Sequence, residues 1–566
     1  MSQGHIEKIK ERFGGSVALM HGQLGDETAV IKRDAWAGVV RYLRDEMGYA
    51  MMLDLCGADY PGREERFEVV LHLRSMKDGK RLRLKTRCPE ADPKVDTLTG
   101  IFAAANWFER EAFDLFGIRF EGHPNLKRIL CHHEFVGHAL RKDYPKARRG
   151  VIPTPETLMD EMQPPITHPS PLRGEGQGEG ERMYLNIGPS HPAMHGCFRV
   201  MVELDGEKIS RAAPEIGYLH RCFEKESEGH PWHTIIPYTD RLNYCSPLMN
   251  NVGYCMAVEK LFGVDIPERA KWVRMLISEV ARICDHLVCN AANLVDLGAL
   301  TNYWYLFNVR EMFTDWIEAL CGARLTTNYT RIGGLVRDIP SSTGAQLKKC
   351  LKDLHIAISH VEGLIKKNRI FMDRTQGVGA ISEDDAIGYG FTGPCLRATG
   401  CDYDVRRAHP YYHYSELDWD IPVGFNGDTY DRVMVRMEEM KQSARLIEQI
   451  LEKMPVGPIM TERRDIALPQ PHEVYGSIEG MMQQFKIVMH GMHPPVGEAY
   501  SYTEAANGEL GFYIVSDGGE KPYRIKVRPP CFSIYQAYPK LIEGRMIADA
   551  VAIMGSLNII AGELDR

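Results

Sequence analysis

The sequence has no C-x-x-C pair, although it contains 14 cysteines scattered through 566 residues. The closest pairs, Cys284 with Cys289 and Cys395 with Cys401, do not have the short spacing of zinc or iron–sulfur ligands. We therefore expect reduced thiols, and no metal or cluster bound by this chain alone.

The sequence also has no run of about 18 apolar residues, the length that a membrane-spanning helix needs. The N-terminal stretch MSQGHIEKIKERFGG carries charges where a signal peptide would be apolar. A formal net charge of −8 gives no reason to expect a nucleic-acid partner. We expect a chain that neither spans a membrane nor is exported, and that is too long for a single core.

Composition divides the chain into two units joined by a linker. Residues 1–150 are predicted to be an α+β domain, because RFEVVLHLRSM and RLRLKTRC read as strands around the turn KDGK and the stretch from Asn106 to Leu115 reads as a helix. Residues 151–182 are dense in Pro, Gly, Ser and Glu, most of all from Pro153 to Arg182. Such a segment buries too little surface to fold, so it is interpreted as a linker between separately folded units.

Residues 183–566 are predicted to form a mainly α-helical bundle with small peripheral β-sheets. Two hairpins are indicated, FRVMVELDGEKISRAA, with its turn at Asp205 and Gly206, and GFYIVSDGGEKPYRIKV. Apolar residues recur every three or four positions from Val433 to Leu451, which predicts a core-facing helix. One long helical stretch is expected from LISEVARICDHL to TNYWYLF, and another from about Pro539.

Three motifs resemble binding sites but lack the context that such sites need. GYGFTG, residues 388–393, has the glycine spacing of a dinucleotide loop, yet SEDDA precedes it where a strand is required and a proline follows. CHHEFVGH, residues 131–138, does not place both histidines on one helical face, so a structural or interface role is favoured over metal binding. A proline separates His409 from His413, and both are interpreted as packed or surface residues.

GPSHPAMHG, Gly188 to Gly196, sets two histidines four residues apart on a loop. Its prolines fix φ and its glycines permit turns closed to other residues, so the loop should be tight and rigid. Such a loop can present a side chain to a cavity. On spacing alone, a structural turn and a site that presents His195 both remain open.

Two further residues could complete a site with this loop. PYTDRLNY ends in Tyr244, whose hydroxyl can donate a hydrogen bond. Asp296 lies among leucine and valine residues, where a carboxylate needs a partner such as a loop histidine. Imidazole and phenol can each donate to a carbonyl oxygen, so His195, Tyr244 and Asp296 together would suit a quinone, which takes up two electrons and two protons.

Both units resemble neighbouring subunits of respiratory complex I, the proton-pumping NADH:quinone oxidoreductase. WFEREAFDLFGIRFEGHPNLKRIL and GHALRKDYP, between Trp107 and Pro145, are similar to the C (30 kDa) subunit. The part of the chain after the linker is similar to the D (49 kDa) quinone-site subunit. The motifs that carry this similarity are GPSHPAMHG, EIGYLHRCFEK, PYTDRLNY, VDLGALTNYW and GARLTTNYTRIGG. The resemblance covers nearly the whole chain outside the linker and implies a fused C/D subunit of the bacterial enzyme.

The resemblance implies roles for individual residues. His195 and Tyr244 would hold the quinone headgroup, Asp296 would pair with His195, and His191 would be a neighbour of the quinone on the same loop. Electrons would reach quinone from a terminal [4Fe-4S] cluster, with protons from the tyrosine and the histidine. The reaction would be coupled to proton translocation in membrane subunits.

The resemblance also implies partners and a location. Arg221 and Arg241 match arginines near the terminal cluster, which the family places in the B-type iron–sulfur subunit. The other implied partners are the I-type ferredoxin-like, G-type and H-type membrane subunits, with NADH and FMN bound elsewhere in the complex. The chain would be a peripheral protein at the cytoplasmic face of the bacterial inner membrane, and the sequence leaves open whether the substrate is ubiquinone or menaquinone.

The D (49 kDa) subunit is in turn similar to the large subunit of nickel–iron hydrogenases, which implies that fold for residues 183–566. A hydrogenase-related subunit of another membrane-bound oxidoreductase is the alternative function. Hydrogenases hold nickel with two C-x-x-C pairs, whereas this chain has only Cys222 in the first region and ends AGELDR. A scaffold without a reacting site is the other alternative and would suit residues 1–150.

Three positions depart from the family pattern. Asn243 stands where many members have Asp, Cys222 where a small residue or Thr is usual, and Thr326 where mitochondrial members have a histidine. The catalytic trio itself is intact.

Overall fold

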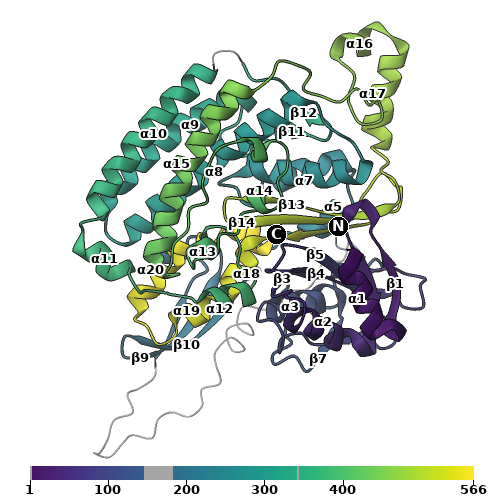
Figure 1. The fold of residues 1–566 in the computed structure, drawn as a ribbon, viewed down its shortest axis with the longest axis horizontal. Coiled ribbons are helices and arrows are strands. Elements are labelled where there is room, and N and C mark those ends of the chain that lie inside the picture. The colour runs from purple at the N-terminus through teal and green to yellow at the C-terminus, as the bar shows by residue number, and fades with distance from the viewer. Residues whose placement is uncertain (1–2, 146–182, 341–342) are drawn as a thin grey trace, which may run out of the picture.

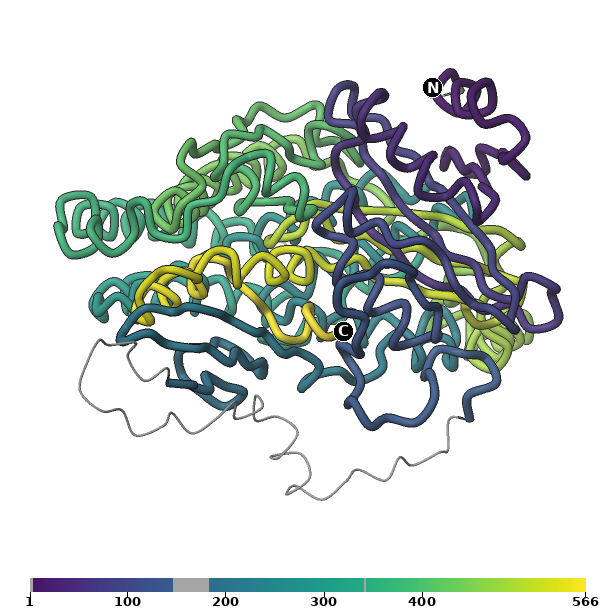
Figure 2. Tube along the Cα trace, turned by 90° about the horizontal axis from the view of Figure 1, so that it is seen from below, coloured from purple at the N-terminus to yellow at the C-terminus, as the bar shows by residue number. Residues whose placement is uncertain are grey.

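The computed structural model describes residues 3–145, 183–340 and 343–566, so the predicted linker lies outside the described residues. A sheet-containing N-terminal unit lies beside a larger helical body (Figure 1). The C-terminal end of the chain lies in the interior, where the two units meet (Figures 1 and 2).

A five-stranded sheet with the order β1-β2-β5-β4-β3 forms the N-terminal unit. Its strands are β1 (Val17–His21), β2 (Thr28–Ile31), β3 (Met51–Asp59), β4 (Phe67–Arg74) and β5 (Arg81–Cys88). The helices of this unit are α1 (Gln3–Phe13), α2 (Trp36–Asp45) and α3 (Ala105–Phe116), and a small parallel pair is formed by β6 (Lys94–Asp96) and β7 (Arg119–Glu121). The predicted β4–β5 hairpin and the predicted helix near Asn106 are confirmed.

Every residue of β4 is buried, which means that both faces of the sheet are covered. Alternate residues of a strand point to opposite faces, so Leu71 and Leu73 belong to the large core while Val70 packs with Tyr500 and Tyr513 of the second unit. His72 stacks on Tyr500 with ring centroids 4.2 Å apart. The second unit therefore covers the face of the sheet that the unit's own helices leave open.

Buried ion pairs cross this boundary. Arg81 donates two hydrogen bonds to Glu509, of 2.8 and 2.7 Å, and Lys526 donates one of 2.6 Å to Glu111. The sequence predicted two separately folded units, and the structure shows that they share an extensive interface. Independent folding of either unit stays a prediction.

Long helices form the core of the second unit: α7 (Pro247–Phe262), α8 (Glu268–Asp296), α9 (Leu300–Cys321), α10 (Thr343–Ile365) and α15 (Thr429–Lys453). The helix predicted between Val433 and Leu451 is confirmed as part of α15. The single helix expected through TNYWYLF is wrong, because α8 ends at Asp296 and α9 begins at Leu300. Gly298 lies between them with φ of 86°, a conformation that interrupts a helix.

Small sheets edge this bundle, as predicted. They comprise β8 (Met183–Ile187), β9 (Arg199–Asp205) and β10 (Lys208–Glu215), the pair β11 (Thr330–Arg331) and β12 (Gly334–Leu335), and β13 (Gly497–Ala505), β14 (Gly508–Ser516) and β15 (Arg524–Arg528). Both predicted hairpins are present, and the first turns at Gly206 and Glu207, one residue later than expected.

Shorter helices complete the described residues, and none of the helices there is long and apolar enough to cross a membrane. They are α5 (Phe223–Ser227), α6 (Ile236–Thr239), α11 (Arg369–Thr375), α12 (Glu383–Gly388), α13 (Pro394–Arg397), α14 (Val405–Ala408), α16 (Pro471–Gly476), α17 (Ile478–His490), α18 (Pro530–Gln536), α19 (Tyr538–Ile542), α20 (Ile547–Leu557) and α21 (Ala561–Asp565). The single helix expected from Pro539 is divided, because Gly544 with φ of 79° separates α19 from α20.

Candidate functional site

The loop from Gly188 to Gly196 follows β8 and contains a short 3-10 turn at Pro192–Met194. A Cβ atom at Gly188 would lie 2.3 Å from the carbonyl oxygen of Phe198, so only glycine fits there. His191 is exposed, and its Nδ1 accepts a hydrogen bond of 3.2 Å from the Ala193 backbone N–H. The His191 ring thus helps to build the loop.

His195 meets Asp296. Its Nε2 lies 2.6 Å from Oδ2 of Asp296, and the two side chains are 24% and 17% exposed. Asp296 is the last residue of α8, where the helix dipole already places partial negative charge. A carboxylate at that helix end adds to this negative charge and faces the imidazole of His195.

Tyr244 joins this pair through the C-terminal segment of the chain. A Cβ atom at Gly196 would lie 3.1 Å from Cβ of Ala561, and one at Gly562 would lie 3.3 Å from Cδ1 of Tyr244. Residues 561–562 thus approach both the histidine loop and the tyrosine. Burial, with help from neighbouring thiols that include Cys197, raises the pKa of the Tyr244 phenol to about 12.

Arg221 and Arg241 line one cavity of about 450 Å³, together with Tyr238, Gly562 and Arg566. Both arginines are exposed, and Nη1 of Arg241 donates a hydrogen bond of 2.7 Å to the carbonyl oxygen of Pro237. Arg241 precedes Tyr244 on the same short segment. Two cationic side chains therefore share a cavity with Gly562, and the Cβ position of Gly562 also lies 3.3 Å from the phenol ring.

Gly562 was not found by reasoning from the sequence. Its Cβ would lie 2.4 Å from the carbonyl oxygen of Arg241 and 2.7 Å from that of Leu242, so the position admits no side chain. Those neighbours come from a segment roughly 300 residues earlier, and no local spacing links the two. The only available signal was the glycine itself, in the C-terminal AGELDR.

The motif at residues 131–138 forms a loop held by Asp114. Oδ2 of Asp114 accepts hydrogen bonds from the backbone N–H groups of Ile129, Leu130 and Cys131, at 3.1, 2.9 and 2.8 Å. A Cβ at Gly217 would lie 2.4 Å from the carbonyl oxygen of Leu130. The loop thus packs on the second unit, which is compatible with the interface role favoured from the sequence.

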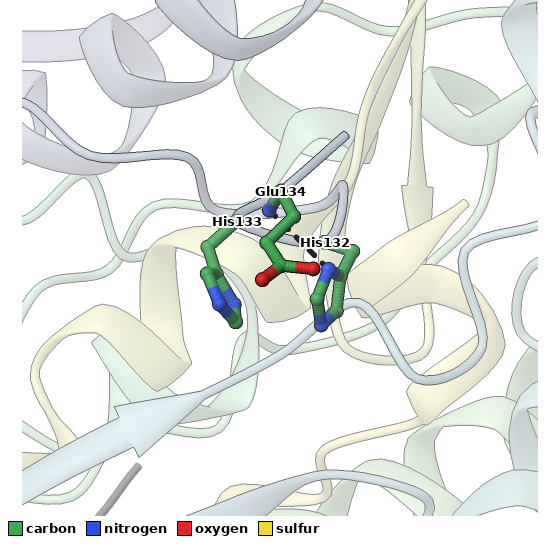
Figure 3. A group of neighbouring side chains, drawn as sticks. All are labelled: His132, His133 and Glu134. Carbon is green, nitrogen blue, oxygen red and sulfur yellow. Dashed lines mark hydrogen bonds between the residues drawn. The ribbon is translucent and has the colours of Figure 1, made fainter. Parts of the chain in front are cut away.

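Three consecutive side chains of this loop, His132, His133 and Glu134, offer ligand atoms within 4.8 Å of one another. Figure 3 shows the Glu134 carboxylate lying between the two imidazole rings. The Glu134 backbone N–H donates a hydrogen bond of 3.3 Å to Nδ1 of His132. The sequence analysis favoured a structural or interface role for this motif over metal binding, and that stays a prediction; it weighed helical spacing alone, whereas neighbouring residues in a loop can bring ligand atoms together without it.

The glycine motif at residues 388–393 packs the two units together. α12, a helix, precedes it where a dinucleotide loop needs a strand. A Cβ at Gly390 would lie 2.7 Å from the carbonyl oxygen of Met52 in the N-terminal unit. His413, which the sequence analysis interpreted as a packed or surface residue, stacks on Trp272 with ring centroids 4.7 Å apart.

Comparisons with known proteins identify both units. The family described as respiratory-chain NADH dehydrogenase, 30 Kd subunit, matches residues 29–149, and the 49 Kd subunit family matches residues 296–566. The chain is therefore of a class in which these two respiratory-chain subunits are fused.

Curated relatives place the chain more narrowly. The NADH-quinone oxidoreductase C/D subunit of Bdellovibrio bacteriovorus is 47% identical over 565 residues, which cover 99% of this chain and 100% of the relative. The C/D subunit of Methylococcus capsulatus is 38% identical over 575 residues, covering 99% and 98%. A D-type subunit of NADH-quinone oxidoreductase from Sorangium cellulosum is 52% identical over 387 residues, covering 68% and 96%. The chain belongs to the family of fused C/D subunits of NADH-quinone oxidoreductase, as the sequence motifs predicted.

Proposed function

We propose that residues 183–566 form the quinone-reduction site of a proton-translocating NADH:quinone oxidoreductase, together with an adjacent iron–sulfur subunit. The observation that carries the proposal is the 2.6 Å contact between His195 and Asp296. Residues 561–562 approach both the histidine loop and the half-buried Tyr244. Family membership supplies the quinone as substrate. We also propose for this unit the fold of nickel–iron hydrogenase large subunits, to which the D (49 kDa) subunit is similar.

The proton chemistry follows from the three side chains. Quinone accepts two electrons and two protons to become quinol, so each carbonyl oxygen gains one proton. Asp296 orients the imidazole and stabilises a positive charge on it, so that His195 can donate one proton. The pKa of Tyr244, raised to about 12 by burial, keeps the phenol protonated at neutral pH, ready to donate the other.

The electrons would come from a [4Fe-4S] cluster of the B-type subunit, facing the cavity with Arg221 and Arg241. Positive charge beside a cluster favours its reduced form. Gly562 lines this cavity and its Cβ position is 3.3 Å from the Tyr244 ring, so the electron donor and the quinone would both lie close to this residue. The I-type, G-type and H-type subunits are proposed as further partners, at the cytoplasmic face of the inner membrane, with NADH and FMN bound elsewhere.

The test is a His195→Asn variant in the intact enzyme. Asn tolerates the left-handed φ of 51° at this position while it removes the imidazole. NADH oxidation by membranes with a short-chain quinone should fall strongly. Oxidation with a hydrophilic acceptor that takes electrons near the flavin should persist. Full quinone activity in an assembled variant would refute the proposed site.

A further inference from the structure

Asp285 of α8 is a fully buried carboxylate that lies behind the segment carrying Tyr244. Its Oδ2 accepts hydrogen bonds from Nδ2 of Asn243, at 2.8 Å, and from Oγ of Ser246, at 3.3 Å. Its Oδ1 accepts one of 2.6 Å from Nδ2 of Asn558. All three donors are neutral, and the neighbouring His286, 4.0 Å away, is itself bonded to a glutamate.

Asn243 connects this carboxylate to Tyr244. Its Oδ1 accepts a hydrogen bond of 3.1 Å from the Cys245 backbone N–H, and its backbone carbonyl accepts one of 2.9 Å from Asn250. The residues on both sides of Tyr244 are thereby fixed. The direction of the phenol therefore depends on Asn243, and Asn243 is held by Asp285.

Asn558 connects the same carboxylate to the C-terminal segment. It shortly precedes Gly562, whose Cβ position lies 3.3 Å from the Tyr244 ring. Its Nδ2 also donates to Oδ1 of Asn507, at 2.5 Å. Asp285 thus holds together the segment that carries Tyr244 and the segment that approaches its ring.

At position 285, only a carboxylate can accept hydrogen bonds from both Asn243 and Asn558. An amide at position 285 would turn an NH2 group toward the NH2 group of either Asn243 or Asn558, and a buried donor facing a donor is unsatisfied. Asn243 cannot turn over to relieve this, because its oxygen already receives the Cys245 N–H.

We propose that Asp285 is a positioning residue for quinone reduction, and that its two oxygens fix Tyr244 by holding Asn243 and Asn558. The inference rests on the proposed function. The hydrogen bond between positions 243 and 285 needs one amide donor and one carboxylate acceptor, and it does not matter which side supplies which. One carboxylate, at position 243 or at position 285 but not at both, should therefore preserve this hydrogen bond.

Exchanging the two side chains provides the test, in the intact enzyme in membranes. Asp285→Asn leaves two amides face to face, and Asn243→Asp leaves two carboxylates face to face. Each single variant should lower kcat for a short-chain quinone by about tenfold or more, with little change in KM, because one buried group loses its partner. The double variant Asn243→Asp/Asp285→Asn restores one carboxylate and one amide, and its kcat should recover to within about threefold of the original.

Asp431→Asn on α15 is a matched control, because Oδ2 of that carboxylate accepts from backbone N–H groups of a neighbouring loop, at Phe425 and Asn426. It should leave quinone reduction unchanged. Unchanged kcat in Asp285→Asn, or a double variant no better than the singles, would overturn the inference. So would loss of the hydrophilic-acceptor activity together with quinone activity, since Asp285 would then be needed for assembly.

Failure of the inference and failure of the proposed function are distinguishable. If Tyr244→Phe retains full quinone activity, the proposed site is wrong. If Tyr244→Phe loses activity while Asp285→Asn does not, only the positioning role is wrong.

Discussion

Gly562 fits against Arg241 only because it has no side chain, since a Cβ atom there would lie 2.4 Å from the Arg241 carbonyl oxygen. The same missing side chain leaves room for the Tyr244 ring, whose Cδ1 lies 3.3 Å from that Cβ position. Gly562→Ala should therefore push the two segments apart, at a cost of about 1 to 3 kcal/mol for an overpacked site. Quinone reduction should fall while assembly survives, measured by both activities in membranes. Gly363→Ala, at an exposed position of α10, is a control for glycine replacement away from the site, since no atom lies within 4 Å of its Cβ position and its backbone is helical.

Tyr244→Phe removes one oxygen and keeps the ring. If the hydroxyl donates to a quinone carbonyl, the loss is on the order of 2 to 4 kcal/mol in the transition state, or roughly one and a half to three decades in rate. NADH oxidation with a short-chain quinone should show this loss, and oxidation with a hydrophilic acceptor should not. Wild-type quinone activity in the assembled variant would assign the headgroup to another residue.

Asp296→Asn keeps the volume of the side chain but removes the charge beside His195. Quinone reduction should weaken because a protonated imidazole is no longer stabilised. Electron transfer to an acceptor upstream of quinone should be retained. Parallel loss of the two activities would instead identify Asp296 as a residue needed for folding.

The buried carboxyl of Glu563 should make the stability of the fold depend on pH. Burial raises the pKa of this carboxyl to about 7, above its ordinary value of 4.5. Between these two values the unfolded chain releases a proton that the folded chain keeps, so the stability of the fold decreases as pH rises. Glu563→Gln removes this penalty, and its Tm relative to the unmodified enzyme should rise from about pH 5 to about pH 7. Melting curves that stay parallel across this range would contradict the assignment.

The interface between the units predicts that separated fragments recombine. Residues 1–150 and 183–566, produced as two chains in one cell, should co-purify because buried ion pairs such as Lys526–Glu111 cross the boundary. Charge reversal by Glu111→Lys should weaken co-purification, since it leaves a buried lysine beside a cation. Full recovery with Glu111→Lys would show that the ion pair does not matter for association.

The sequence predicted the local elements well where one signal decided them. The β4–β5 hairpin and α15 follow from alternation and from a three-to-four-residue repeat. The break at Gly298 was missed because apolar residues continue through it, and only the backbone conformation of that glycine ends α8. The ends of elements depend on such single residues more than on pattern.

The sequence motifs were enough to name the residues of the candidate site. They were not enough to name the residues that hold those side chains in place. His195 and Asp296 were paired in advance because a carboxylate in apolar surroundings needs a partner, and the two lie 2.6 Å apart. Gly562 and Asp285 act through contacts between segments distant in the chain. One sequence carries no local trace of such contacts.

The interface between the two units, which ion pairs cross, also suggests a reason for joining them in one chain. The Sorangium cellulosum relative matches 68% of this chain, about the length of residues 183–566, over 96% of its own length. A unit of this kind therefore exists as a separate polypeptide. Joining the units converts a bimolecular association into an intramolecular one, with an effective concentration in the range of about 1 mM. Dilution then no longer separates them, and every quinone-site unit is made with one copy of its partner.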